Sequence, residues 1–188
     1  MKRALTYTAR IIGLAIGLVA SSAQAQTTAN GPYYANPSWD QSLPSNTRFI
    51  VLSNMNSEAV LDRETGLVWQ RSPSPPSTHY GWASGQQQCR EFTHIGNRLG
   101  WRMPTVEELA SLVDTSVPPP GPTLPAGHPF INVSTDTATD YFTATSQVGT
   151  DHIYSVSFYF GIVFERLSKA TSPGNLWCVR GGQGLDPQ

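Results

Sequence analysis

The chain has 188 residues, with 12 lysines and arginines against 13 aspartates and glutamates, and two cysteines. This length suits one domain that buries its own core, so no second domain is expected. Nucleic-acid binding needs a clustered basic surface, and the basic residues here are few and scattered. The composition therefore excludes nucleic acid as a partner.

The first 25 residues have the three parts of a secretory signal peptide. A basic start precedes an apolar run at residues 11–20, and Ala23 and Ala25 form an Ala-x-Ala cleavage site. We expect cleavage after Ala25 and a periplasmic or secreted protein. Cleavage would leave 9 basic against 13 acidic residues, a net charge of −4. The apolar run is about ten residues, short of the roughly 20 that span a membrane, so no span is expected after cleavage.

The rest of the chain divides into three parts. Residues 26–47 are rich in Asn, Ser, Thr and Pro without an apolar period, which predicts an extended leader. A single domain is expected over residues 48–183, followed by a short tail at 184–188.

Cys89 and Cys178 are the only cysteines. Disulfides persist in exported proteins, so one bridge between them is expected, with two free or intermolecular thiols as the alternative. On the chain-entropy model, closing a loop of about 90 residues stabilises the fold by roughly 4 to 5 kcal/mol.

Three short apolar runs open the domain. Residues 49–52 predict a strand, and the runs at 59–62 and 67–70, separated by a turn that ends in Gly66, predict a hairpin.

A helix is expected at residues 83–94. Cys89, Phe92 and Ile95 follow one another in steps of three, which places them on one helical side.

The segment 100–114 predicts a strand end and a capped helix. Pro104 disfavours helical geometry at the residue before it. Thr105 lies three residues before Glu108, which is the spacing of a capping box. Leu109 and Leu112 begin an apolar stripe that would pack this helix on a core.

Residues 117–129 contain six prolines and predict a surface loop. Beyond this loop, strands are expected at 141–145, 153–158, 162–164 and 176–180. Strands, two short helices and further strands indicate an α+β domain with a mostly antiparallel sheet.

The order of four motifs resembles the domain of unknown function 1566, also called the Legionella collagen-like protein C-terminal domain family. The resemblance runs from about residue 49 to residue 182. The motifs are Leu61-Asp62-x-x-Thr65-Gly66-Leu67-x-Trp69, Gly100-Trp101-Arg102-Met103-Pro104-Thr105-x-x-Glu108-Leu109, Tyr141-Phe142-Thr143-Ala144-Thr145 and Cys178-Val179-Arg180-Gly181-Gly182. Met103 and Phe142 stand where the family more often has Leu and Trp.

This resemblance implies a C-type-lectin-like fold. The best-studied member of the family is an adhesin that binds sulfated polysaccharides through a trimeric, collagen-stalked form. The present chain has no Gly-X-Y repeat, and its negative net charge gives no attraction to sulfate groups. The resemblance therefore implies the fold rather than the ligand.

Arg102 and Arg180 lie in strand-like motifs among apolar neighbours. A buried arginine is usually paired and hydrogen-bonded, so we expect structural ion pairs with Glu108, Asp114 or Asp62. The alternative is a guanidinium clamp for a carboxylate or sulfate ligand.

No cofactor is expected, apart from one candidate cation site. Asp136, Asp140 and Asp151 lie in loop-rich sequence, where oxygen ligands can bind calcium. The four histidines lack metal-ligand spacing.

Two tryptophans are candidate ligand contacts. Trp39 and Trp82 lie near irregular segments and could stack on a sugar, whereas Trp69, Trp101 and Trp177 lie in strand motifs and are expected in the core.

The sequence therefore indicates an exported, non-catalytic binding or interaction module, for a cell-surface glycan or a protein partner. The first alternative is an enzyme related to the sulfatase-activating, formylglycine-generating fold, which depends on reactive cysteines. The second is a structural subunit of a surface assembly, and the oligomeric state is left open.

Overall fold

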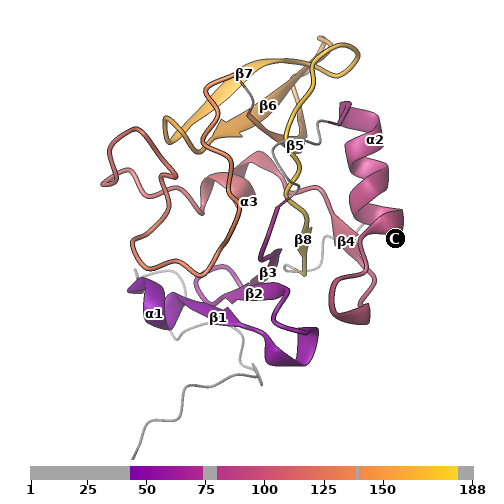
Figure 1. Cartoon of the computed structure of the whole chain (residues 1–188). Helices are drawn as coiled ribbons and strands as arrows, with labels where there is room; N and C mark the ends of the chain where they lie inside the picture. Colours follow the sequence, from indigo (N-terminus) through magenta and orange to yellow (C-terminus); the bar gives the residue numbers. More distant parts are fainter. Residues whose placement is uncertain (1–42, 74–79, 139, 182–188) are drawn as a thin grey trace, which may run out of the picture.

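The computed structural model describes residues 43–73, 80–138 and 140–181 (Figure 1). The predicted signal peptide, most of the predicted leader with Trp39, and the tail at 184–188 lie outside the described residues. Within the described part, no helix is both long and apolar enough to cross a membrane.

The first sheet has five antiparallel strands in the order β1-β2-β3-β8-β4. Its strands are β1 (Phe49–Val51), β2 (Ala59–Asp62), β3 (Leu67–Gln70), β4 (Trp101–Arg102) and β8 (Val179–Arg180). The predicted hairpin is confirmed as β2 and β3, with Gly66 at φ +71° in their turn. The last strand is shorter than the predicted 176–180. It enters the sheet between β3 and β4, which are distant in sequence.

The second sheet has three antiparallel strands in the order β5-β6-β7. These are β5 (Tyr141–Ser146), β6 (His152–Ser157) and β7 (Ile162–Ser168). Figure 1 shows this sheet at the top and the first sheet below it, with the short helix α3 (Val106–Ala110) between them. The predicted α+β class with mostly antiparallel sheets is confirmed.

Two further helices flank the sheets. Helix α1 (Ser45–Arg48) lies in the segment predicted as leader, so regular structure begins three residues before the predicted start. Helix α2 (Trp82–Gln87) continues as a π-helical turn, Gln88–Phe92. Single 3-10 turns occur at Ser53–Met55 and Ile95–Asn97.

The π-helical turn changes the predicted helix face. Cys89 is fully buried, but the side chain of Phe92 is 61% exposed. A wider i→i+5 turn rotates the residues that follow it, so the three-residue spacing no longer keeps one side against the core. The prediction that Phe92 shares the buried side was therefore wrong.

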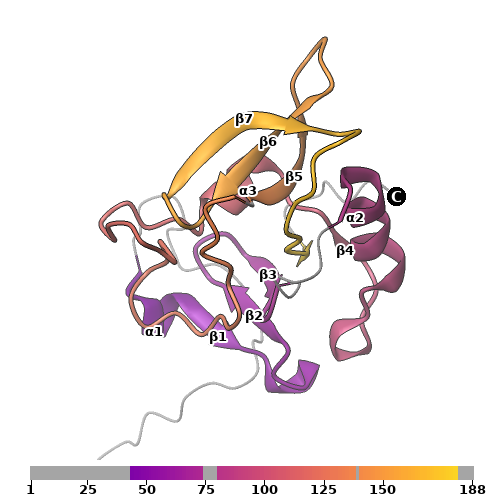
Figure 2. The same cartoon turned by 45° about the horizontal axis from the view of Figure 1, so that its top comes forward.

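The first sheet has an apolar cluster on each face, because successive residues of a strand point to opposite faces. Figure 2 shows α3 close to β5 and β6, and α2 close to β4. We call these clusters the α3 side and the α2 side. The α3 side contains Phe49, Val60, Leu67, Trp69, Leu109, Leu112, Leu124, Phe130, Tyr141, Val156, Phe158, Trp177 and Val179. The α2 side contains Leu52, Met55, Ala59, Leu61, Cys89, Trp101, Met103, Phe142, Ile153, Leu176 and Cys178.

The proline-rich segment packs on the α3 side, and we call residues 117–130 the proline strap. The segment has no helix or strand, as predicted, but it does not lie wholly at the surface, because Leu124 and the following Phe130 are buried in the α3-side cluster. Thr123 donates its N–H and its hydroxyl to the Phe158 carbonyl at 2.9 and 3.0 Å. A Cβ at Gly121 would lie 1.9 Å from that same carbonyl oxygen, so the close approach requires glycine.

Candidate functional site

Arg102 is bound to α3 by a bidentate ion pair. Its Nη1 and Nη2 each donate to one carboxylate oxygen of Glu108 at 2.7 Å, and Nη2 also donates to the Gly181 carbonyl at 2.9 Å. The guanidinium fork and the carboxylate are therefore used inside the domain rather than presented to a ligand.

The same carboxylate closes the predicted capping box. Glu108 accepts from the Thr105 N–H at 2.9 Å, while the Thr105 hydroxyl accepts from the Glu108 N–H at 3.3 Å. The Thr145 hydroxyl accepts from the Val106 N–H at 3.0 Å, which attaches the helix start to β5. Glu108 thus joins the strand β4 to the first turn of α3.

Burial raises the pKa of Glu108, but the hydrogen bonds and charge of Arg102 and the hydrogen bonds at Thr105 together outweigh it, so the pKa lies below its ordinary value of 4.5. The carboxylate is therefore ionised at neutral pH, as both the ion pair and the cap require.

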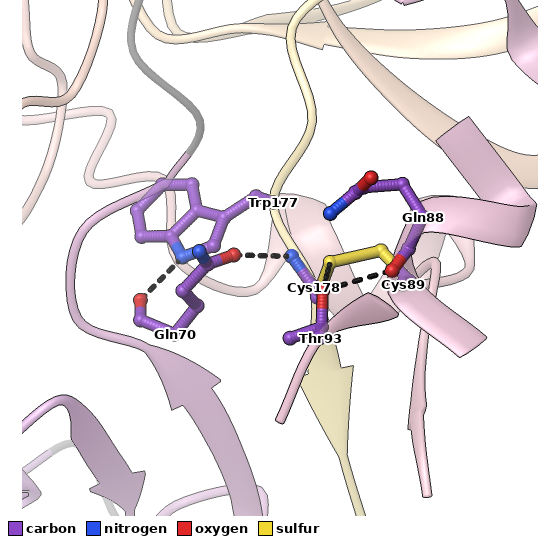
Figure 3. The surroundings of a disulfide bond; sticks show 6 residues. All are labelled: Gln70, Gln88, Cys89, Thr93, Trp177 and Cys178. Carbon is purple, nitrogen blue, oxygen red and sulfur yellow. Dashed lines mark hydrogen bonds between the residues drawn. A yellow bond between two sulfur atoms is a disulfide. The ribbon is translucent and has the colours of Figure 1, made fainter. Parts of the chain in front are cut away.

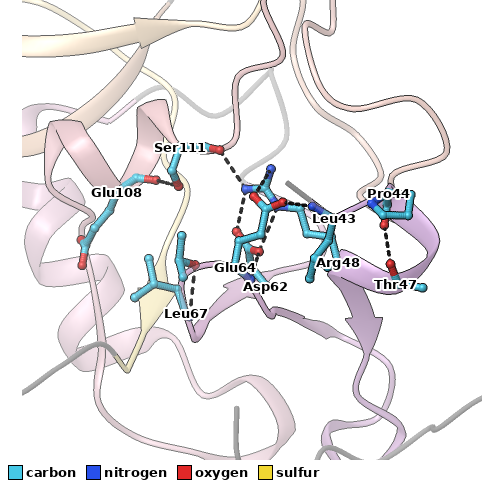
Figure 4. A network of polar contacts seen from close by, with 10 residues as sticks. Leu43, Pro44, Thr47, Arg48, Asp62, Glu64, Leu67, Glu108 and Ser111 are labelled. Carbon is cyan, nitrogen blue, oxygen red and sulfur yellow. Dashed lines mark hydrogen bonds and ion pairs between the residues drawn. The ribbon is translucent and has the colours of Figure 1, made fainter. Parts of the chain in front are cut away.

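A second arginine, Arg48, binds the other end of α3 (Figure 4). Its Nε and Nη2 donate to the two oxygens of Asp62 at 2.9 and 2.8 Å, and Nη2 also donates to the Ser111 carbonyl at 2.8 Å. Its Nη1 pairs with Glu64 at 2.9 Å, and Glu64 accepts from the Leu43 N–H. Sequence reasoning missed Arg48, although a basic residue directly before an apolar strand was a signal for it.

Two predicted ion pairs are corrected. Asp62, expected to bind Arg102 or Arg180, binds Arg48 instead. Asp114 accepts from the N–H and hydroxyl of Ser116 at 2.9 and 2.6 Å, and these bonds lower its pKa. Neither Asp114 nor Arg180 forms an ion pair within the described residues.

Arg180 faces away from Arg102. Trp101 pairs with Arg180 and Arg102 pairs with Val179, so the two arginines point to opposite faces of the sheet. The Arg180 Nε donates to the Leu99 carbonyl at 2.7 Å. The pairing of β4 with β8 therefore prevents Arg102 and Arg180 from binding the same anion.

Cys89 and Cys178 form a disulfide that joins the π-helical turn to the start of β8 (Figure 3). Both residues are buried, with exposures of 0% and 1%. Gln70 accepts from the Cys178 N–H at 3.3 Å through its side chain and from the Trp177 indole N–H at 2.7 Å through its carbonyl. No cysteine of the chain is a free thiol in the structure.

The three calcium candidates have separate surroundings. Asp136 accepts from the Ala138 N–H, Asp140 is buried and accepts from the Ser155 hydroxyl, and Asp151 accepts from the Ser168 hydroxyl. Within 43–73, 80–138 and 140–181, no group of three acidic, histidine or cysteine residues could bind a metal ion. The three aspartates therefore do not share one site.

One predicted ligand contact, Trp82, and one predicted calcium residue, Asp151, both contact Lys169. The Lys169 ammonium lies 5.3 Å from the ring centre of half-buried Trp82, while the Lys169 N–H donates to the Asp151 carbonyl at 2.9 Å. The Ser168 hydroxyl lowers the pKa of the exposed Asp151 side chain. We call Trp82, Asp151, Ser168 and Lys169 the Trp82–Lys169 surface.

The indole N–H edge of Trp82 is held by a hydrogen bond to β5. Its indole N–H donates to the Thr143 carbonyl at 2.9 Å, so β5 determines the orientation of the ring. Lys169 then contacts the ring face. The ring also packs against the α2-side cluster, so a ligand could meet only the exposed part of the ring and the ammonium beside it.

Comparison with known proteins identifies the domain. A family model described as the Lcl C-terminal domain matches residues 58–180. The chain belongs to this family. The family expected from the sequence motifs is thereby confirmed. No curated protein matches the chain.

The matched part of this Lcl C-terminal domain contains most of the geometry above. It includes the disulfide, the Arg102–Glu108 pair and the Trp82–Lys169 surface, whereas Arg48 precedes it. Arg102, Glu108 and both cysteines are thus engaged in the fold, and the Trp82–Lys169 surface is the candidate for contact with a ligand.

Proposed function

We propose that this protein is an exported, non-catalytic binding module whose ligand is a glycan or a protein at the cell surface. The observation that carries the proposal is the Trp82–Lys169 surface, where the Lys169 ammonium lies over an aromatic ring that is held in place by β5, and where the exposed Asp151 carboxylate binds the neighbouring Ser168. Membership of the Lcl C-terminal domain family, which indicates a surface or extracellular domain, supports it. The signal-like residues 1–25 support export to the periplasm or beyond.

The groups that could catalyse a reaction are already bound to other residues, which argues against the enzyme alternative. Thiol-dependent catalysis needs an accessible thiolate, and both cysteines are buried in a disulfide. Glu108 is paired with Arg102 and also caps a helix, so it is not available as an acid or base. These are the features expected of a domain whose polar residues maintain its shape.

A glycan array probed with the oxidised protein tests the proposal. Wild-type protein is expected to bind a restricted set of glycans, and Trp82→Ala is expected to weaken that binding by about tenfold, or about 1.4 kcal/mol, from the lost contact with the ring. Lys169→Met should weaken it less. Val148→Ala, at a 97% exposed residue outside this surface, is the matched control and should bind like wild type. Equal binding by Trp82→Ala and wild type would contradict the assignment.

A structural subunit of a surface assembly is the second candidate, and one observation favours it. β7 is an edge strand, and Phe160, Ile162 and Val163, at its start and in the turn before it, are 39%, 46% and 43% exposed. Exposed apolar side chains on an edge strand are typical of association surfaces. Light scattering coupled to size exclusion should find a stable oligomer if this candidate is correct, and a monomer if it is not.

A further inference from the structure

His128 lies where the proline strap meets the core. Its imidazole stacks on the Phe130 ring, with centroids 6.0 Å apart and planes inclined by 29°. Its Nδ1 atom is buried and has no hydrogen-bond partner among the described residues. The backbone N–H of His128 donates to the Pro125 carbonyl at 3.1 Å, which folds the strap back on itself.

Phe130 connects this imidazole to the centre of the α3 side. Its ring packs edge-on against Phe49 at 5.2 Å and against Trp177 at 5.0 Å. Phe130 is 4% exposed and Trp177 is fully buried. The imidazole therefore rests on the last aromatic ring of a continuous buried row.

The neutral imidazole fits this position and the imidazolium does not. A neutral ring can carry its proton on Nε2 and leave Nδ1 as an acceptor, whereas the imidazolium carries a proton on both nitrogens. Protonation would therefore place a charged N–H at a buried atom without an acceptor, which is costly. Burial also lowers the pKa of His128 below its ordinary value of 6.5.

The charged groups near this row of aromatic rings would not stabilise a protonated His128. Arg71 donates its Nε to the Pro129 carbonyl at 3.1 Å and its Nη1 to the Ser57 carbonyl at 3.2 Å, so the charge next to the strap is positive. Arg48 lies 4.8 Å from the Phe49 ring centre, and its carboxylate partners are bound to it. Within the described residues, no carboxylate forms a salt bridge with His128.

We propose that His128 is a pH-sensitive latch of the proline strap, which holds residues 125–130 on the core when neutral and releases them when protonated. The same release would reach α1, because the Ser45 hydroxyl donates to the Ala126 carbonyl. Since the pKa is lowered by folding, the neutral ring stabilises the closed strap above about pH 6.5, and that stabilisation is lost as the pH falls below this value. Acidification thus loosens both the strap and the attachment of the N-terminal segment.

Hydrogen exchange measured by mass spectrometry tests this latch at about pH 7.5 and about pH 5. His128→Phe keeps a ring on Phe130 but cannot be protonated. Both proteins should protect the strap equally at the higher pH. At the lower pH, peptides covering residues 125–130 should exchange faster in wild type than in His128→Phe, because only wild type can be protonated there. Comparing two proteins at one pH removes the intrinsic effect of pH on exchange.

Two further measurements keep the test decisive. His152→Gln, which removes an exposed histidine on β6, should keep the acid response of wild type. An NMR titration of wild type should give His128 a pKa below 6.5 even if His128→Phe folds poorly. Equal strap exchange in wild type and His128→Phe at about pH 5, or a His128 midpoint at or above 6.5, would overturn the proposal.

Discussion

The two faces of the five-stranded sheet are held together by different chemistry. On the α2 side, a disulfide buried in the apolar cluster joins the π-helical turn to β8. On the α3 side, two arginines bind the two ends of a five-residue helix, Arg102 at its first turn and Arg48 beyond its last. Helices this short are unstable alone, so each depends on its cross-links to the sheet. One face is fixed covalently, and the other by charge and hydrogen bonds.

This difference has consequences for solution conditions. The disulfide side should respond to reductants and be indifferent to moderate changes in pH. The α3 side should respond to acid, because Glu108 must be ionised to bind Arg102 and its pKa is lowered in the fold. The four changes below separate the two sides, in order of decreasing expected effect on the free energy of unfolding.

Replacing both cysteines should have the largest effect. The double variant Cys89→Ala, Cys178→Ala frees a loop of 89 residues, and the chain-entropy model gives a loss of roughly 4 to 5 kcal/mol. Urea unfolding measures the loss, and hydrogen exchange should show α2 loosening more than α3. A loss below about 1 kcal/mol would mean that the covalent link contributes little to the α2 side.

Arg48→Met should cost about 3 to 5 kcal/mol, because it leaves the fully buried Asp62 carboxylate without its cation. The double variant Arg48→Met, Asp62→Leu is the matched control. It removes the stranded charge as well, so it should recover part of the loss in a urea unfolding experiment. A double variant no more stable than Arg48→Met alone would contradict this explanation.

Thr105→Ala removes one half of the capping box and should cost about 1 kcal/mol. The thermal midpoint is the simplest readout. Thr105→Ser retains the hydroxyl that accepts from the Glu108 N–H, so it should melt close to wild type. Identical melting of Thr105→Ala and wild type would show that the cap does not stabilise α3.

Acid should weaken the α3 side gradually. The folded-state pKa of Glu108 lies below 4.5, so its stabilisation is complete above that value and is lost as the pH falls through the folded-state pKa. Because Glu108 is partly exposed, the contribution should be less than about 1 kcal/mol. Glu108→Gln should reduce the slope of unfolding free energy against pH in this range. An unchanged slope would show that Glu108 does not contribute to the acid sensitivity of the fold.

Local signals in the sequence were sufficient for part of the fold. The β2–β3 hairpin follows from two apolar runs around a turn, and the start of α3 follows from Pro104, Thr105 and Glu108. Each depends on residues within a few positions of one another. The β6–β7 pair likewise joins two strands that were predicted next to each other in the sequence, at 153–158 and 162–164.

Long-range features were beyond such signals. The π-helical turn that exposes Phe92 contains the bridged Cys89, and the three-residue spacing of the apolar residues gives no sign of it. The partner of Asp62 is Arg48 because β1 and β2 align Phe49 with Asp62, a register that no local pattern specifies. The burial of Leu124 within a proline-rich segment depends on the approach of that segment to Phe158.

The candidate ligand surface was predicted only in pieces. Trp82 and Asp151 were each named for a different reason, as a stacking residue and a calcium ligand. Lys169 brings them together through one backbone bond and one ring contact. No sequence pattern predicts either contact, because both depend on the position of the end of β7 relative to α2.

The central claim is that Arg102 maintains the fold while Trp82 contacts the ligand. Binding of a glycan identified on the array should be measured for Arg102→Met and Trp82→Phe at a temperature where both are folded, together with their urea stabilities. The account predicts that Arg102→Met loses stability yet binds normally once folded, whereas Trp82→Phe keeps most of its stability and binds more weakly. A stable Arg102→Met that has lost binding, beside a Trp82→Phe that binds like wild type, would contradict it.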